Sequence, residues 1–359
     1  MTSGWSLAVG PDAPDLIPVH VITGFLGSGK TTLLRQALAS PAFANTAVVV
    51  NEFGEIALDH LLLQRVDPDT VVLQTGCVCC TLRSELGAAL RDLYEKRERG
   101  RVPPFDRLAI ETTGLADPAP LLFTLMADPV LRHHFRLGSV VTTVDAVNGP
   151  RQLAQHLESV KQVAVADRLV LTKTDLVDRA GIDRVRAAVV RYNPTAPLIE
   201  TPTAALAPDR LFAGEMSDSP HGGDEAPGWS RAHARLRVSR PDDGGQTLDR
   251  HARDISAVSL IVDLPLDWPA FGTWLTMLLH AHGEDILRVK GIVRVRGVSA
   301  PVVIHGVQHL VHPPTFLERW PTADRRSRLV LIVRKLPAPA LERSLRAFLR
   351  LAPHDRRAA

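Results

Sequence analysis

The stretch GFLGSGKTT at residues 24–32 restricts the fold of this chain more than any other part of the sequence. It matches the phosphate-binding loop pattern G-x-x-x-x-G-K-[ST], which requires a strand before it and a helix after it. The β-branched run 17–23 predicts that strand, and residues 30–40, ended by Pro41, predict that helix. The chain is therefore expected to contain a P-loop domain.

The glycines of this loop let successive backbone N–H groups point at phosphate oxygens, and the following helix adds a favourable dipole. Lys30 is placed for the β- and γ-phosphates, and Thr31 is placed for Mg²⁺. The residues expected to bind the nucleotide here are Gly24, Gly27, Ser28, Gly29, Lys30, Thr31 and Thr32.

All three cysteines of the chain, Cys77, Cys79 and Cys80, lie in the segment GCVCC. A disulfide framework would spread an even number of cysteines along the chain. Thiolates at this density suit a soft or borderline metal such as Zn²⁺, Cu⁺ or Co²⁺, and three of them leave a fourth tetrahedral position open for transfer. A buried cysteine-rich strand end and a redox site are the alternatives.

Composition excludes several classes of protein. A length of 359 residues predicts about two domains. A net charge of +3 with interleaved acids and bases predicts no nucleic-acid partner. No apolar run is long enough for a membrane span, so no membrane partner is expected. Free thiols without an export signal predict a cytoplasmic protein.

Short β-rich runs alternate with helical stretches from residue 17 to about residue 203, which predicts a mostly parallel α/β sheet. The expected strands are 17–23, 47–51, 71–74, 107–111, 140–145, 167–172 and 197–200. The expected helices are 30–40, 83–98, 118–127, 150–162 and 178–191. Ligands of such sheets bind at the carboxyl ends of the strands.

Turn-forming residues dominate the region 204–230, which predicts a flexible linker. We therefore expect a lead-in at 1–16, a P-loop domain at 17–203, and a smaller α+β domain at 231–359. The expected elements of that domain are strands 257–263, 286–296, 301–307 and 328–333, and helices 268–280 and 339–351. The turn near Gly297 predicts an antiparallel hairpin.

Two further segments follow predicted strands and concern the nucleotide. In LAIETTG, Glu111 is placed to hold Mg²⁺ through water, and the N–H of Gly114 is placed to sense the γ-phosphate. TKTD resembles the guanine-specificity motif N-K-x-D. In it, Asp175 would accept both guanine donors and the stem of Lys173 would cover the base. Thr172 stands where Asn is usual, which leaves the preference for GTP over ATP open.

Together these segments resemble the CobW-type GTPases, a family of metal-insertion proteins and metallochaperones. The resemblance covers residues 17–351 and rests on GFLGSGKTT, NEFGEIALD, GCVCC, IETTGLADPAP, TKTD, DILRVKG and GVQH, in that order. It implies a P-loop GTPase domain followed by a CobW C-terminal domain. It also implies slow hydrolysis of GTP to GDP with Mg²⁺, coupled to delivery of Zn²⁺ or Co²⁺ to a client metalloprotein.

The resemblance also assigns residues. It implies that Cys77, Cys79 and Cys80 hold the transferred metal, with Glu52 and Glu55 as accessory ligands. Lys30, Glu111 and Asp59 become the catalytic candidates, with Asp59 as a Mg²⁺ or water-positioning acid. Related GTPases dimerise with nucleotide, so a nucleotide- or metal-dependent homo-oligomer is open. We expect His305, His309 and His312 to be surface or packing residues on alternating strand positions.

Two rival functions remain from the sequence. One is a P-loop kinase or ATPase with structural cysteines, which a preference for ATP would favour. The other is a non-catalytic zinc-binding regulatory module that nucleotide merely stabilises.

Overall fold

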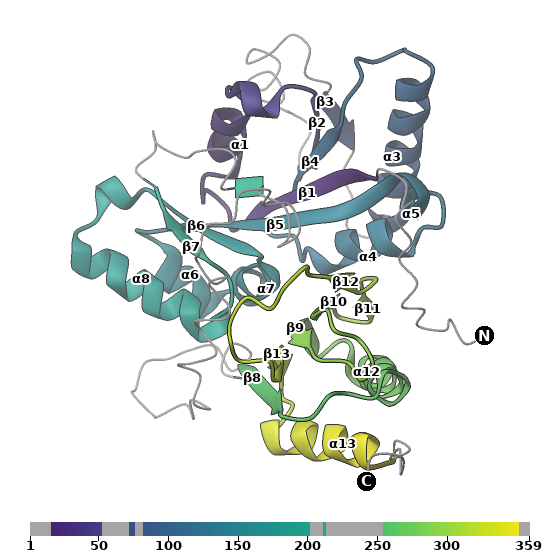
Figure 1. Cartoon of the computed structure of the whole chain (residues 1–359). Helices are drawn as coiled ribbons and strands as arrows, with labels where there is room; N and C mark the ends of the chain where they lie inside the picture. The colour runs from purple at the N-terminus through teal and green to yellow at the C-terminus, as the bar shows by residue number, and fades with distance from the viewer. Residues whose placement is uncertain (1–15, 52–71, 76–81, 202–210, 213–253, 352–359) are drawn as a thin grey trace. The chain divides into compact units, whose positions relative to one another are not determined.

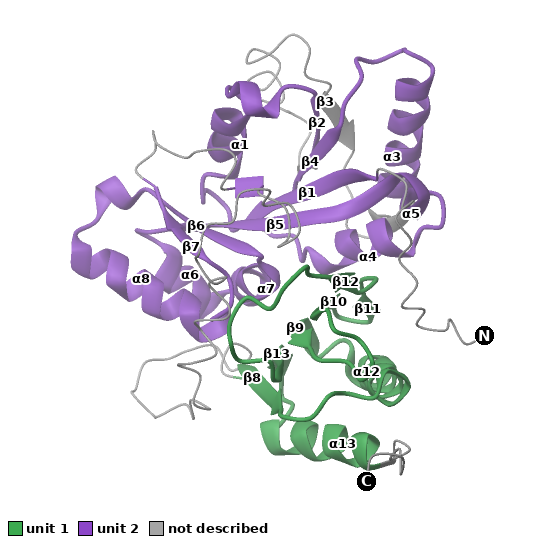
Figure 2. Ribbon diagram, viewed as in Figure 1, with its two compact units in different colours: residues 1–13, 223–246, 254–359 green, residues 14–222, 247–253 purple. Residues whose placement is uncertain are grey.

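The structure is a computed structural model, and it describes residues 16–51, 72–75, 82–201, 211–212 and 254–351 (Figure 1). These residues fall into two compact units (Figure 2), one holding the described residues up to 212 and the other holding 254–351. The predicted domain boundaries near residues 203 and 231 lie outside the described residues. Among the described helices, none has the length and apolar character needed to cross a bilayer.

The first unit is built on a seven-stranded sheet with the order β3-β2-β4-β1-β5-β6-β7. Every pairing between these strands is parallel. The prediction of a mostly parallel α/β sheet is confirmed. The strands are β1 (Ile17–Gly24), β2 (Thr46–Asn51), β3 (Val72–Thr75), β4 (Arg107–Glu111), β5 (Phe135–Asp145), β6 (Arg168–Thr172) and β7 (Leu198–Glu200).

Helices surround this sheet, so its central strands are apolar and buried along nearly their whole length. β1 lies between β4 and β5, where the order of the strands reverses, and this is the place where such sheets bind ligands. The helices are α1 (Lys30–Leu38), α3 (Leu82–Glu98), α4 (Ala119–Ala127), α5 (Leu131–His134), α6 (Gly149–Gln155), α7 (Leu157–Val165) and α8 (Arg179–Tyr192), with short 3-10 turns η1 (Pro41–Phe43) and η2 (Thr174–Leu176).

Two local predictions for this unit were wrong. β5 begins at Phe135 rather than at residue 140, because Gly138 lets the strand pass the ring of His20: a Cβ at Gly138 would lie 2.7 Å from that ring. The single helix expected over 150–162 is broken at His156, which has an extended backbone and stacks on Phe25 with 4.6 Å between ring centroids. Tertiary contact has thus overridden local helix propensity.

Two residues inside the predicted linker are also not part of a surface connection. Leu211 and Phe212 are buried in the core of the first unit, and the ring of Phe212 lies 4.7 Å from that of His20 and 5.0 Å from that of Phe43. The rest of the predicted linker is outside the described residues.

The second unit is an antiparallel sheet with helices packed against it. The strand order is β11-β10-β9-β13-β8, and β12 pairs with β10. The hairpin of β9 and β10 is antiparallel, as predicted. The elements are β8 (Ile255–Val262), α12 (Trp268–His282), β9 (Ile286–Val293), β10 (Val302–Val307), β11 (Leu310–Val311), β12 (Thr315–Phe316), β13 (Ser327–Arg334) and α13 (Ala338–Leu351).

His305, His309 and His312 are surface or packing residues, as expected, but they do not share one strand. His305 is buried on β10, and its ring centroid lies 6.2 Å from that of His312, which follows β11. His309 lies in the turn after β10, where its Nδ1 is 3.0 Å from the carbonyl oxygen of Leu279. Within the described residues, no group of three or more His, Cys, Asp or Glu is arranged to hold a metal.

Candidate functional site: a phosphate loop, an acid and a base loop at one sheet edge

The phosphate loop follows β1 and needs its first glycine. Gly24 has φ 143°. A Cβ at this position would lie 2.3 Å from Thr143 Oγ1 on β5 and 2.7 Å from Ser28 Oγ. Gly27 and Gly29 also have positive φ, at 69° and 91°. The backbone therefore takes a path that only glycine allows without strain.

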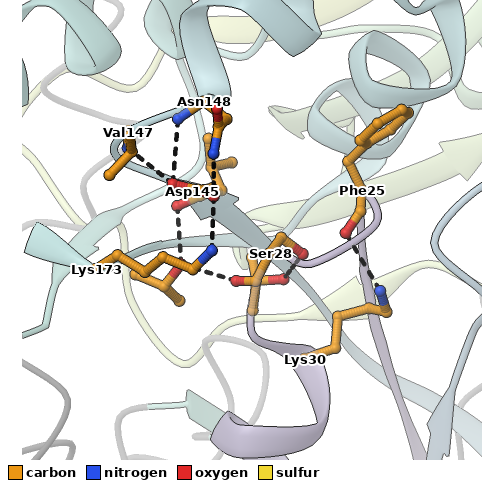
Figure 3. A network of polar contacts seen from close by, with 10 residues as sticks. Phe25, Ser28, Lys30, Asp145, Val147, Asn148 and Lys173 are labelled. Carbon is orange, nitrogen blue, oxygen red and sulfur yellow. Dashed lines mark hydrogen bonds and ion pairs between the residues drawn. The ribbon is translucent and has the colours of Figure 1, made fainter.

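Two buried side chains stabilise the loop. The hydroxyl oxygens of Ser28 and Thr143 lie 2.6 Å apart, which ties the loop to β5. Lys30, which is 8% exposed, donates from Nζ to the carbonyl oxygen of Phe25 at 3.3 Å (Figure 3). Its ammonium therefore lies over the loop and not in solvent, as a phosphate-binding lysine requires.

Thr31 and Glu111 meet across the edge of the sheet. Thr31 Oγ1 donates to Glu111 Oε1 at 2.6 Å, and Glu111 is 5% exposed at the end of β4. β4 pairs directly with β1, which brings the acid to the start of α1. A hydroxyl and a carboxylate side by side are the hard oxygen donors that Mg²⁺ prefers, so this pair fits the ion. Thr31 and Glu111 would hold Mg²⁺, which would supply positive charge to offset that of the phosphates.

The loop after β4 touches the phosphate loop through Gly114. A Cβ at Gly114 would lie 2.6 Å from Leu26 Cδ2 and 2.7 Å from both the Cα and the N of Leu26. Backbone atoms cannot move aside as a flexible side chain can. The predicted γ-phosphate sensor is therefore in contact with the P-loop, and no larger residue fits at this position.

Two residues of helix α7 bond to the same loop. Gln162, which is 1% exposed, donates from Nε2 to the carbonyl oxygens of Gly114 and Ala116 at 3.2 and 3.0 Å. Lys161 Nζ lies 2.7 Å from Asp117 Oδ2. Sequence reasoning missed both residues of α7, because nothing local indicates that this helix packs beside the loop.

The segment TKTD, residues 172–175 at the carboxyl end of β6, is predicted to contact the nucleotide base and is called the base loop. It is anchored by two threonines. Thr172 Oγ1 donates to the carbonyl oxygen of Ser28 at 2.7 Å, so the residue that replaces the usual Asn ties this loop to the P-loop. Thr174 Oγ1 donates to the carbonyl oxygen of Thr201 at 2.5 Å. Asp175 lies in η2 and is exposed, where it can accept hydrogen bonds from a base.

Lys173 bonds to an acid that the sequence analysis had assigned no role. Its Nζ lies 2.8 Å from Asp145 Oδ2 at the end of β5 (Figure 3). Burial opposes ionisation of Asp145, but hydrogen bonds from Lys173, Asn148 and Val147 outweigh it, so its pKa lies below the ordinary value. The signal that could have found Asp145 is its position at a strand end.

The structure thus brings Lys30, Thr31, Glu111, Gly114 and the base loop to one edge of the sheet. The predicted metal ligands Cys77, Cys79, Cys80, Glu52 and Glu55, and the predicted catalytic acid Asp59, lie outside the described residues. Their assignment stays a prediction.

Both units match known protein families. Residues 18–200 match the family described as CobW/HypB/UreG, nucleotide-binding domain. Residues 255–349 match the family described as cobalamin synthesis protein cobW C-terminal domain.

Curated relatives match nearly end to end. The chain is 32% identical to the zinc chaperone YjiA of Escherichia coli K12, over 89% of this chain and 95% of that protein. It is 30% identical to the zinc chaperone CobW of Pseudomonas aeruginosa, over 93% and 92%. It is also 30% identical to the zinc-regulated GTPase metalloprotein activator 1 of Schizosaccharomyces pombe, over 90% and 83%. A crystal structure of zinc-bound YjiA GTPase from E. coli matches with a TM-score of 0.66 at 27% identity, over 93% of this chain and 99% of the other.

Proposed function

Because this chain belongs to the CobW family, with both of its domains matched, we propose that it is a GTP-hydrolysing metallochaperone that delivers zinc to a client protein. The relatives named as zinc chaperones and as zinc-regulated GTPases support this function. Cobalt fits the same thiolate ligands and is the alternative cargo.

The observation that carries the GTPase assignment is the pair of Thr31 and Glu111, 2.6 Å apart beside the P-loop. Phosphoryl transfer needs a metal held between a P-loop hydroxyl and a strand-end acid, together with a loop that senses the γ-phosphate. Gly114, in contact with Leu26, supplies that loop. No arginine finger is evident in the sequence, so we expect slow intrinsic hydrolysis.

Support for the metal site comes from where two strands end. β2 and β3 are paired in register, and Asn51 lies opposite Thr75. Glu52 directly follows the first strand, and the segment GCVCC directly follows the second. In the sequence, the segment with Glu52 and Glu55 and the segment with Cys77, Cys79 and Cys80 therefore follow two neighbouring strands. We propose that they form the site for the transferred metal.

The proposed cycle couples this site to the nucleotide. GTP and Mg²⁺ order the loops 51–59 and 112–118 and complete a tight metal site. Hydrolysis then loosens the site and releases the ion to a docked client. Asp59 is proposed as a second acid near Mg²⁺ or the attacking water. By linkage, metal must tighten GTP binding by the same factor by which GTP tightens metal binding.

The first test is a chelator-competition titration of Zn²⁺ and of Co²⁺ under reducing, anaerobic conditions. It compares a non-hydrolysable Mg-GTP analogue with Mg-GDP. Much tighter metal binding with the triphosphate is expected, and replacing Cys77, Cys79 and Cys80 by Ser should abolish the nucleotide-dependent part. Equal affinity in both states would break the proposed coupling.

A Lys30→Ala variant separates the rival functions. It should lose nucleotide binding and, with it, the gain in metal affinity. Unchanged metal affinity in this variant would favour a zinc-binding regulatory module. Preference of the wild-type protein for ATP would favour a kinase or ATPase. Sedimentation with Mg-GTP and Zn²⁺ measures whether nucleotide or metal assembles the chain into an oligomer.

A further inference from the structure

A buried carboxylate lies beside the base loop without touching the predicted phosphate site. Asp145 ends β5, and only 2% of its side chain is exposed. Its Oδ1 accepts from the backbone N–H groups of Val147 and Asn148 at 2.7 and 3.1 Å. Its Oδ2 lies 3.0 Å from Asn148 Nδ2 and 2.8 Å from Lys173 Nζ. Both oxygens are therefore satisfied, and Oδ2 carries an ion pair.

The ion pair joins two very different environments. The side chain of Lys173 is 37% exposed, whereas the carboxylate of Asp145 is almost fully buried. A buried carboxylate needs a compensating cation, and breaking such a pair from one side is costly. Lys173 is the cation that the structure places on Asp145. The pair therefore fixes the end of a long side chain that would otherwise sample many rotamers.

The backbone of the base loop is fixed in the same way. Lys173 has φ 56°, a left-handed conformation that is unusual for a residue with a side chain. Its neighbour Thr172 is hydrogen-bonded to Ser28 of the P-loop, and its neighbour Thr174 is hydrogen-bonded to Thr201, which directly follows β7. Strained residues persist where their surroundings determine them, and they cluster at ligand clamps. Three consecutive residues are thus anchored, and Asp175 is left exposed.

We propose that Asp145 is a positioning residue of the base pocket: its carboxylate holds the ammonium of Lys173 so that the stem of Lys173 lies against the guanine. This inference rests on the proposed binding of GTP and GDP. Asp145 acts only through Lys173 and touches no nucleotide atom. Without the carboxylate, the ammonium turns to water and the stem leaves the base, so affinity falls.

The chain offers a matched control for an Asp145→Asn variant. Asp128 also accepts, through Oδ1, from the N–H groups two and three residues on, at 2.9 and 3.1 Å, and its Oδ2 pairs with Arg91. Asp128 follows α4 and lies outside the base loop. Asp128→Asn therefore removes the same kind of charge from the same kind of turn. A loss of local stability alone would lower the thermal unfolding temperature of both variants.

The experiment titrates Mg-GDP and Mg-IDP into the full chain by calorimetry and records thermal unfolding of each variant. Asp145→Asn should raise the Kd of GDP about tenfold, which corresponds to about 1.4 kcal/mol. Asp128→Asn should leave this Kd within about twofold. The Kd of IDP, which lacks the exocyclic amine, should rise by the same factor as that of GDP, because the stem contacts the face of the base and not its edge.

Substitutions of Lys173, the exposed partner of the pair, test the proposal a second time. This test does not depend on whether the Asp145→Asn variant folds. Lys173→Met should weaken GDP binding about as much, Lys173→Arg should retain most of the affinity, and Asp145→Asn added to Lys173→Met should cost little more. Wild-type affinity in Asp145→Asn or in Lys173→Met would overturn the proposal, as would a loss for GDP that IDP does not share. Failure of the wild-type chain to bind Mg-GDP would instead refute the proposed function itself.

Discussion

A buried histidine on β1 should make the first unit lose stability in mild acid. His20 is 3% exposed, and its Nδ1 accepts from the N–H of Ser139 at 3.0 Å. Burial is the main cause that lowers its pKa from 6.5 to about 3, and three guanidiniums lower it further: Arg107, Arg136 and Arg168. The folded protein therefore keeps this ring neutral, whereas the unfolded chain protonates it below pH 6.5.

The sign and size of the effect follow from linkage. Because the folded pKa is depressed, stability is complete above pH 6.5 and is lost as the pH falls toward 3. With these two pKa values, the loss from His20 is about 1.4 kcal/mol at pH 5.5 and about 2.7 kcal/mol at pH 4.5. Carboxylates also titrate in this range, so the His20 contribution must be isolated by substitution.

The assay is urea unfolding of the wild-type chain and of His20→Gln, followed by circular dichroism at pH 7.5 and pH 5.5. Gln keeps an acceptor for Ser139 but cannot be protonated. The stability advantage of the wild type over the variant should shrink by about 1.4 kcal/mol between the two pH values. A control variant, His133→Gln at an exposed position, should show no such change. An advantage that does not vary with pH would refute the reasoning.

Three further predictions concern the nucleotide site. Glu111→Gln removes a charge from the pair with Thr31 and should slow GTP hydrolysis on the order of 100-fold in single-turnover phosphate release; hydrolysis at the wild-type rate would remove Glu111 from the Mg²⁺ site. Gly114→Ala places a Cβ against the backbone of Leu26 and should slow hydrolysis at least about tenfold in the same assay; hydrolysis at the wild-type rate would mean that this close contact does not matter for the reaction. Thr172→Val removes the hydroxyl that donates to Ser28 and should weaken GDP binding about two- to tenfold; an unchanged Kd would mean that this tether does not position the base loop.

The parts of the site that sequence could predict are those fixed by local pattern. The P-loop was found from its own spacing, and Glu111 was expected beside it because parallel strands end at one edge of the sheet. Asp145 and Gln162 were not found, because the role of Asp145 depends on β5 lying beside β6, and that of Gln162 depends on α7 lying beside the loop after β4. The residue pattern of one sequence does not show which strands lie next to each other in the sheet.

Local propensity also failed where tertiary contact decides. Residues 150–162 carry a continuous helical pattern, yet the helix is interrupted at His156, whose ring stacks on Phe25 of the P-loop. The early start of β5 depends on Gly138 and His20, which meet across the sheet and lie far apart in the sequence. Such contacts are visible only once the chain is folded.

The interruption at His156 places α7 between two loops of the candidate site, the P-loop and the loop after β4. Just before its first turn, His156 stacks on Phe25 of the P-loop, and further along the helix Gln162 donates to Gly114 and Ala116 in the loop after β4. One short helix thereby contacts both the P-loop and the loop after β4. If the proposed cycle displaces either loop, a single spectroscopic label on α7 would report the change.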